Sequence, residues 1–164
     1  MTSMEHQPSP AVSNKLEDMP HIEPYLASSV EFYSANNIPI EQASWNAETS
    51  ELTLEMETSE KNQGYKGVGH GGFTSILIDS LAGFAALIKM PDLEKIAVTR
   101  EIRNLRFVRP MPIGVLIKAT GKVVSVKADR ISALAYIEEA ESGKIIAQGS
   151  VEMSLIEQEK DTSI

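Results

Sequence analysis

The feature that most constrains the fold is a glycine-rich loop that leads directly into a long apolar segment. The loop covers residues 67–72 (GVGHGG), and the apolar segment, residues 73–90, carries a single acid, Asp79. Glycines just before a helix leave its first backbone N–H groups uncovered, at the positive end of the helix dipole. The loop therefore has the outline of a site that stabilises an oxyanion.

The apolar segment has the spacing of an amphipathic helix. Its apolar residues recur at intervals of three and four, which predicts a wide apolar side that covers a sheet. Beside it runs a stripe in which every residue except Asp79 is small, so another backbone, a partner helix or a slender ligand could lie there. The apolar side consists of Phe73, Ile76, Leu77, Leu81, Phe84, Ala85 and Ile88, and the small stripe of Gly72, Ser75, Ala82, Gly83 and Ala86.

Alternating apolar residues predict strands on both sides of this helix. Two short runs before the helix have the pattern of a hairpin, and four longer runs follow it, separated by turn signals. We expect consecutive runs after the helix to pair antiparallel as a meander, and the sheet to wrap around the helix. The short runs are 43–47 and 52–56, and the long runs are 96–108, 115–126, 131–138 and 144–155.

Length and composition predict one globular domain with a tail at each end. The chain has 164 residues, of which 42% are hydrophobic, enough for one proper core. Residues 1–20 contain three prolines and no apolar periodicity, which predicts a disordered leader. We expect a short amphipathic helix within 21–39, the sheet domain over 40–157, and a disordered tail over 158–164.

Composition also excludes several classes of protein. The absence of cysteine rules out disulfide scaffolds, thiolate zinc sites and cysteine nucleophiles. A net charge of −8 disfavours nucleic-acid binding, which needs a basic surface. There is no run of about 18 uncharged apolar residues to span a membrane, and the N-terminus lacks the plan of a secretory signal. We therefore expect a cytoplasmic protein without a membrane span.

Motifs that compete for the glycine loop lack their required context. The GxGxxG pattern of residues 67–72 follows no buried strand, and no phosphate-binding P-loop or nucleophile elbow is present. A serine triad would have to combine His70 with Ser75 or Ser80. Three or four converging metal ligands are missing around His70, so we predict neither a metal nor a cofactor.

The spacing within the helix implies a second copy of the chain. Asp79 lies two turns into the helix, about 12 Å from the loop at 1.5 Å per residue, too far to share a bound carbonyl with the N–H of Gly71. If two copies pair so that each helix lies beside the partner's loop, Asp79 of one and Gly71 of the other face the same carbonyl.

These residues resemble a known family. The pattern His70-Gly71-Gly72 with Asp79 and Gly83, followed by the segment NLRFVRP over 104–110, resembles the hotdog-fold acyl-CoA thioesterases of the PaaI-like group. The resemblance covers about residues 40–156. It implies an α+β hotdog fold, with a six-stranded antiparallel sheet wrapped around one long central helix. It also implies hydrolysis of an acyl-CoA substrate by a homodimer or a dimer of dimers, with active sites across the dimer interface.

The resemblance assigns roles to the matching positions. Asp79 is the catalytic carboxylate, as general base or as nucleophile, Gly71 donates its N–H to the oxyanion, and His70 shapes the loop. Gly72 contributes to substrate binding. Six basic residues crowd into positions 89–109 and could serve the phosphates of coenzyme A; the family match favours Arg106, together with Arg130 in a later turn.

Two positions depart from the family pattern. Relatives place an Asn six residues before the histidine, where this chain has Gly64, and the nearest Asn is Asn62, the substrate-binding candidate. Relatives also place a Ser or Thr ten residues before the proline, where this chain has Arg100. A one-residue β-bulge would restore the neighbouring Thr99 as a catalytic residue.

The departures leave two further functions open. A non-catalytic acyl-CoA-binding or regulatory homologue would explain the displaced polar residues. A hotdog hydratase would need a histidine together with the acid on the helix, and no histidine follows Asp79.

Overall fold

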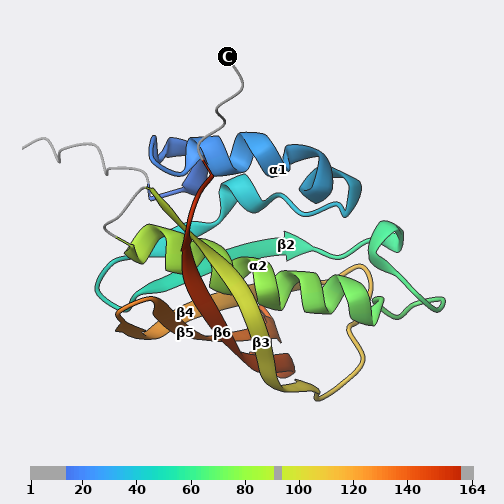
Figure 1. The fold of residues 1–164 in the computed structure, drawn as a ribbon. Helices are drawn as coiled ribbons and strands as arrows, with labels where there is room; N and C mark the ends of the chain where they lie inside the picture. The colour runs from blue at the N-terminus through green and yellow to red at the C-terminus, as the bar shows by residue number, and fades with distance from the viewer. Residues whose placement is uncertain (1–13, 91–93, 160–164) are drawn as a thin grey trace, which may run out of the picture.

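In a computed structural model, which describes residues 14–90 and 94–159, a six-stranded antiparallel sheet wraps around one long helix (Figure 1). This is the predicted hotdog architecture. The helices are α1 (Glu23–Ala35) and α2 (Gly71–Lys89), with short 3-10 turns at Leu16–Asp18, Ile40–Gln42 and Glu60–Asn62. The strands are β1 (Ser44–Asn46), β2 (Glu51–Glu57), β3 (Lys95–Phe107), β4 (Leu116–Lys127), β5 (Arg130–Glu139) and β6 (Ile145–Glu157).

Helix α2 forms the centre of the core. Its apolar side packs on the sheet as the spacing predicts, and burial of each large side chain contributes roughly 1.5–3 kcal/mol. By length and composition alone α2 could cross a membrane, but this apolar side is occupied by the sheet. The buried residues of α2 are Phe73, Thr74, Leu77, Ile78, Ser80, Leu81, Ala82, Phe84, Ala85 and Ala86.

One glycine lets the sheet close tightly on α2. A Cβ placed on Gly121 of β4 would lie 2.3 Å from the carbonyl oxygen of Leu81 and 2.7 Å from the backbone nitrogen of Ala82. Both atoms belong to the helix backbone and have no freedom to move aside. Only glycine therefore allows β4 to pass this close to α2, and the depth of the core depends on it.

The strand order corrects one expectation. The sheet runs β1-β2-β4-β5-β6-β3, so β4, β5 and β6 form a meander, but β3 does not pair with β4 as predicted. Instead β3 pairs with β6 at the far edge. The connection after β3 passes the glycine loop, where Val68 bridges Pro112 and buried Met111 holds Gly69. That contact is non-local, and turn signals in the sequence do not reveal it.

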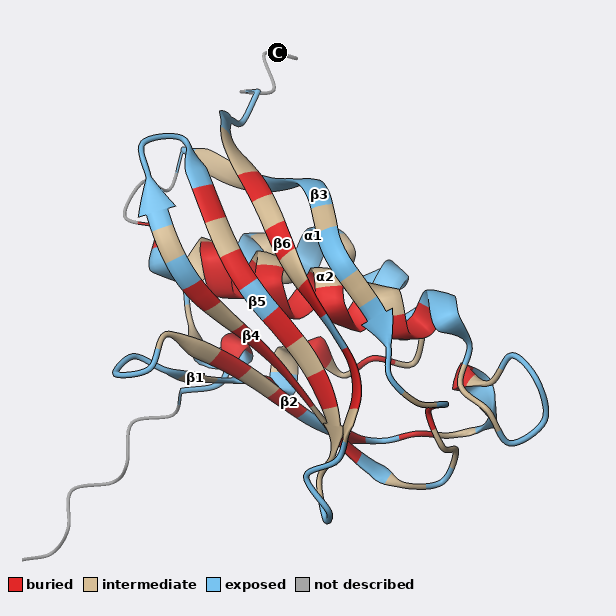
Figure 2. Ribbon diagram, turned by 90° about the horizontal axis from the view of Figure 1, so that it is seen from below, coloured by how far each residue is buried: buried red, intermediate tan, exposed pale blue. Residues whose placement is uncertain are grey.

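Strand β3 has an unpaired edge. Within residues 14–90 and 94–159 it is the last strand in the order and pairs with β6 alone, as Figure 2 shows at the border of the sheet. Two register shifts interrupt its pairing with β6, one between Thr99 and Glu101 and one between Arg103 and Arg106. An exposed edge of this length is a surface on which another strand can pair.

The N-terminal region is more ordered than its composition predicts. Residues 1–13 lie outside the described part, but Leu16 is fully buried and its N–H donates to the Ala43 carbonyl. Residues 14–20 therefore pack on the domain, because one leucine finds a core site that no periodicity marks. Helix α1 follows within the predicted span and has no fully buried residue. Of the expected tail, residues 160–164 lie outside the described part.

We predict that Gly121→Ala lowers the free energy of unfolding by about 1–3 kcal/mol, because the added methyl group overpacks the contact with α2. Urea denaturation measures this. Gly83→Ala on α2 is the control, since a Cβ there meets nothing within 4 Å and alanine favours the helix by about 0.5–1 kcal/mol. A Gly121→Ala protein that unfolds at the wild-type urea concentration would contradict this account of the core.

Candidate active site

The glycine loop is organised by the ring of His70. This residue is the N-cap of α2, with extended backbone angles, and its Nδ1 accepts a hydrogen bond of 2.8 Å from the N–H of Gly72. Its own backbone N–H donates to the carbonyl of Asn62 at 2.8 Å. The ring thus satisfies one of the open donors at the helix start, as serine or aspartate caps commonly do. The ring therefore fixes the backbone where the loop joins α2.

Glycines make room for that ring on two sides. A Cβ on Gly72 would lie 2.8 Å from the Nδ1 of His70, and one on Gly64 would lie 3.2 Å from its Cδ2. Any side chain at these positions would press on the imidazole. Gly64 stands where relatives have an asparagine. In this chain its lack of a side chain therefore leaves space for the His70 ring.

The backbone N–H of Gly71 is left open for a ligand. Gly71 is the first helical residue, and among the described residues its N–H finds no hydrogen-bond acceptor. The loop before it is fixed, because the N–H of Gly69 donates to the Met111 carbonyl at 2.9 Å. An open N–H on a fixed helix start, in the positive end of the dipole, has the chemistry of an oxyanion donor.

The predicted β-bulge is present and brings Thr99 to Asp79. The pairing of β3 with β6 shifts between Thr99 and Glu101, so Arg100 is the extra residue. The Thr99 hydroxyl donates to Oδ1 of Asp79 at 2.5 Å. Asp79 is half-buried on α2, and the hydrogen bond fixes the direction of its carboxylate.

Tyr33, which the sequence analysis did not single out, lies near Asp79 and Ser80. The Tyr33 hydroxyl, from α1, donates to the hydroxyl of Ser80 at 3.0 Å. Burial raises the pKa of Tyr33 above its ordinary value of 10.0; the bond to Ser80 opposes this rise and the charge of Asp79 adds to it. The Tyr33 hydroxyl therefore stays protonated near neutral pH. Ring contacts with Phe32 and Phe84 hold the side chain.

Asn62 supports the loop from within. Its side chain is only 2% exposed, its amide oxygen accepts from the N–H of Ser59, and its amide nitrogen donates to the Asn36 carbonyl. These bonds tie the loop to the end of α1. In this structure the Asn62 amide is committed to the protein and does not face the Asp79 region.

The two candidate coenzyme-binding arginines lie far apart in one chain. Arg106 pairs with Gln148 of β6, beside the glycine loop, whereas Arg130 aligns with Ser154. Six residues of β6 separate these levels, about 20 Å at 3.3 Å per residue. Arg130 lies at the level of Val98, next to Thr99. Both arginines are exposed, and one chain does not bring them together.

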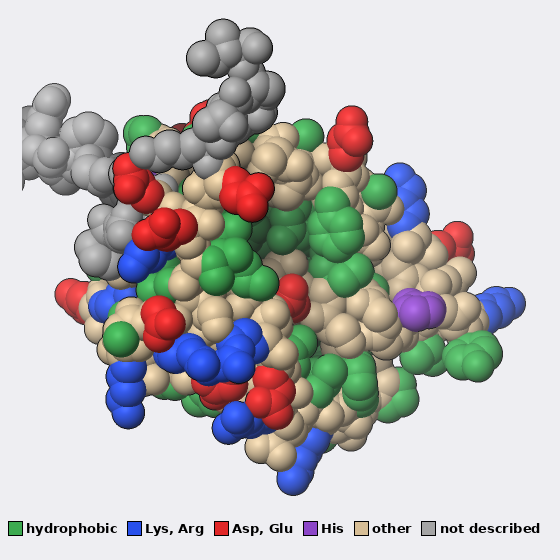
Figure 3. Space-filling view, viewed as in Figure 1, with side chains coloured by type: hydrophobic (Ala, Val, Ile, Leu, Met, Phe, Trp, Pro, Cys, Tyr) green, Lys and Arg blue, Asp and Glu red, His purple; other side chains and the backbone are tan. Residues whose placement is uncertain are grey.

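One face of the molecule is hollowed and apolar between α1 and α2. Figure 3 shows hydrophobic side chains gathered around a hollow between α1 and α2, with charged side chains over β3. Gly71 and Asp79 occupy α2 eight residues apart, which is about 12 Å along the axis. One chain therefore presents the candidate donor and the candidate acid as two separate half-sites. Within residues 14–90 and 94–159, no three acidic or histidine side chains group as metal ligands.

Comparisons with known proteins agree with this architecture. Residues 66–146 match the model of a family described as the thioesterase superfamily. The solved structure of thioesterase HI1161 from Haemophilus influenzae superposes with a TM-score of 0.71 at 19% sequence identity, over 93% of this chain and 99% of that one. No curated protein sequence matches the chain.

Two further similar structures contain coenzyme A derivatives. The protein smu.793 from Streptococcus mutans, bound to acetyl-CoA, has a TM-score of 0.60 at 17% identity, over 71% of this chain and 88% of that one. An acyl-CoA hydrolase from Staphylococcus aureus, in complex with butyryl-CoA, has a TM-score of 0.61 at 14% identity, over 68% of this chain and 66% of that one. At these identities the likeness establishes the fold.

Proposed function

We propose that this chain, whose residues 66–146 match the thioesterase superfamily model, hydrolyses an acyl-CoA thioester to a free acid and coenzyme A. One observation carries this proposal: the bulge places the Thr99 hydroxyl so that it donates a hydrogen bond to the half-buried Asp79 carboxylate. The open N–H of Gly71 supplies the second group that thioester hydrolysis needs. The narrower PaaI-like assignment stays a prediction.

The mechanism follows from where charge develops. Attack on the thioester carbonyl converts it to a tetrahedral oxyanion, and one N–H aimed at that oxygen contributes about 3 kcal/mol. Asp79 acts in one of two ways. As a general base it takes a proton from the attacking water, and that proton passes to the departing thiolate. As a nucleophile it bonds to the acyl carbon and releases the thiolate, and water then cleaves the resulting anhydride.

Two copies of the chain assemble each site in this proposal. Strand β3 has an open edge, and Val98, Phe107 and Val108 on or just after it are 39%, 54% and 51% exposed. Pairing of two β3 edges would cover these side chains and bring the α2 helices side by side. The Gly71 N–H of one copy would then approach the Asp79 carboxylate of the other. Each homodimer has two such sites by symmetry.

The dimer also explains the separation of the two arginines. Arg106 lies at the level of Gly71, and Arg130 at the level of Asp79. A site that combines Gly71 of one copy with Asp79 of the other is flanked by Arg106 from the first and Arg130 from the second. Arg109 is a third candidate, because its Nε is buried and has no partner among the described residues, and a phosphate oxygen would satisfy it.

A second candidate is an acyl-CoA-binding protein without turnover. It is favoured by the missing polar group at the family's asparagine position, where Gly64 only makes room for His70 and the Asn62 amide is buried. The same half-sites would then hold the thioester without activating water.

We predict that Asp79→Asn lowers kcat by about 100- to 10,000-fold, because the amide neither takes a proton nor attacks carbon. Steady-state hydrolysis of a panel of acyl-CoAs measures this, and coenzyme A affinity should persist. Asp18→Asn, a surface change at the N-terminal 3-10 turn, is the matched control. Equal rates for Asp79→Asn and wild type would exclude Asp79, and binding without turnover in the wild type would favour the second candidate.

We predict that Gly71→Pro lowers kcat by about 100- to 1,000-fold with little loss of stability. Proline removes the N–H, yet it is accepted as the first residue of a helix, and His70 before it already has the extended angles that proline requires. Gly71→Ala is the control, because it keeps the N–H and its Cβ lies no closer than 3.8 Å to Phe107. Similar kcat values for the two variants would argue against the oxyanion role.

A further inference from the structure

Tyr33 stands between the Asp79 region and a separate groove. Its hydroxyl reaches Ser80, the residue next to Asp79 on α2. The same residue lines a groove between α1, the 3-10 turn Ile40–Gln42 and strand β2. Tyr33 therefore contacts both surroundings. Neither Asp79 nor Ser80 lines the groove.

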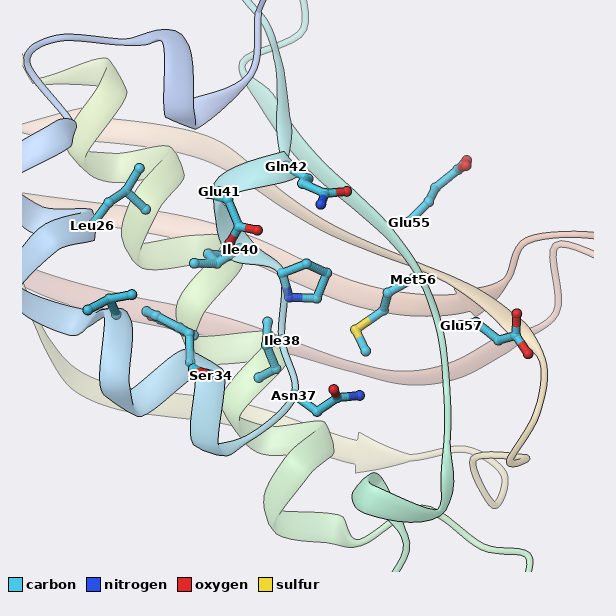
Figure 4. Close-up of a pocket in the computed structure, with 13 residues that line it drawn as sticks. Leu26, Ser34, Asn37, Ile38, Ile40, Glu41, Gln42, Glu55, Met56 and Glu57 are labelled. Atoms are coloured by element: carbon cyan, nitrogen blue, oxygen red, sulfur yellow. The ribbon is translucent and has the colours of Figure 1, made fainter.

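The groove is large enough for a hydrocarbon chain, and it has an apolar wall beside the polar residues Asn37, Glu41 and Gln42. Its volume is about 640 Å³, within the usual range for ligand pockets of roughly 300–1,000 Å³. Figure 4 shows Met56 of β2 pointing toward Ile38, with Ile40 beside them, while Glu55 and Glu57 point away. Leu26 and Val30 of α1 complete the apolar wall.

The Tyr33 side chain is fixed at several points. Its ring packs on Phe84 of α2 with centroids 5.9 Å apart, and edge-on against Phe32 at 5.2 Å. The hydroxyl is anchored at 3.0 Å on Ser80, which is 6% exposed. Displacing this ring would break the hydrogen bond and both aromatic contacts together. These contacts therefore hold the Tyr33 side chain in one position.

We propose that Tyr33 sets the upper length of the acyl group, by closing the path from Asp79 into the groove lined by Ile38, Ile40 and Met56. The inference rests on the proposed acyl-CoA site and goes beyond it to substrate class. In this proposal a short acyl group fits between Asp79 and the Tyr33 ring, whereas a long acyl chain would collide with the ring. Helix α1 lies outside residues 66–146, the part that matches the family model.

Removing the ring should open the groove to longer chains. Each additional methylene that is buried is worth about a fourfold gain in binding. A chain that extends past position 33 by even two methylenes would therefore gain about tenfold or more in relative specificity. Tyr33→Phe keeps the ring and loses only the hydroxyl, so it should keep the length limit.

The experiment compares kcat/KM for dodecanoyl-CoA with that for butyryl-CoA. We expect the ratio to rise about tenfold or more in Tyr33→Ala, and to stay near the low wild-type value in Tyr33→Phe. Tyr33→Leu is a second shortened variant that keeps apolar packing should alanine unfold α1. Tyr25→Ala is the matched control, because Tyr25 is on the same helix and packs on the core but does not line the groove.

Several results would overturn the inference about Tyr33 without contradicting the proposed hydrolysis. They are an unchanged ratio in both Tyr33→Ala and Tyr33→Leu, an equal rise in Tyr25→Ala, or wild-type preference for the long chain. If no variant or wild type hydrolyses any acyl-CoA, the proposed function fails instead. In that case the length limit is tested by binding. The ratio of the dissociation constants for S-dodecyl- and S-butyl-coenzyme A, which lack the thioester carbonyl, is compared among the same variants and the wild type.

Discussion

Helix α2 carries both chemical groups of the proposed site, and its own geometry keeps them apart. An α-helix rises about 1.5 Å per residue, so the N–H of Gly71 and the carboxylate of Asp79 cannot meet on one small carbonyl group. The sheet closes on this helix at Gly121. One chain therefore presents the two groups as separate half-sites, which a second copy would join in the proposed dimer.

Each half-site is held by a small set of specific contacts. At the helix start, the His70 ring caps the Gly72 N–H and rests between two glycines, which leaves the Gly71 N–H open. Two turns later, the bulge at Arg100 turns Thr99 toward Asp79. In both cases the atom that would act in the proposed reaction is positioned by a neighbouring side chain. Such support is what preorganised catalytic groups require.

Much of this could be read from the sequence because it depends on local patterns. The helical spacing of α2, the strand runs and the offset between Arg100 and the proline all lie within short stretches of chain. The bulge was predictable because a one-residue slip is the only way to bring Thr99 to the position that relatives fill. The half-site separation followed from helix rise alone.

The features that escaped prediction depend on contacts between distant segments. The pairing of β3 with β6, the buried amide of Asn62 and the docking of Leu16 are decided by packing that no periodicity records. Tyr33 escaped for the same reason, since its partner Ser80 is 47 residues away. Sequence patterns assign elements, whereas tertiary contacts decide which side chains meet.

The most direct test of a shared site is complementation between two inactive chains. Asp79→Asn and Gly71→Pro chains with different tags would be co-expressed, and the heterodimer isolated by both tags. In the shared arrangement one site of that heterodimer combines an intact Asp79 with an intact Gly71, so the account predicts about half the wild-type activity per dimer. A heterodimer as inactive as the two parent homodimers, beside an active doubly tagged wild-type dimer, would contradict it.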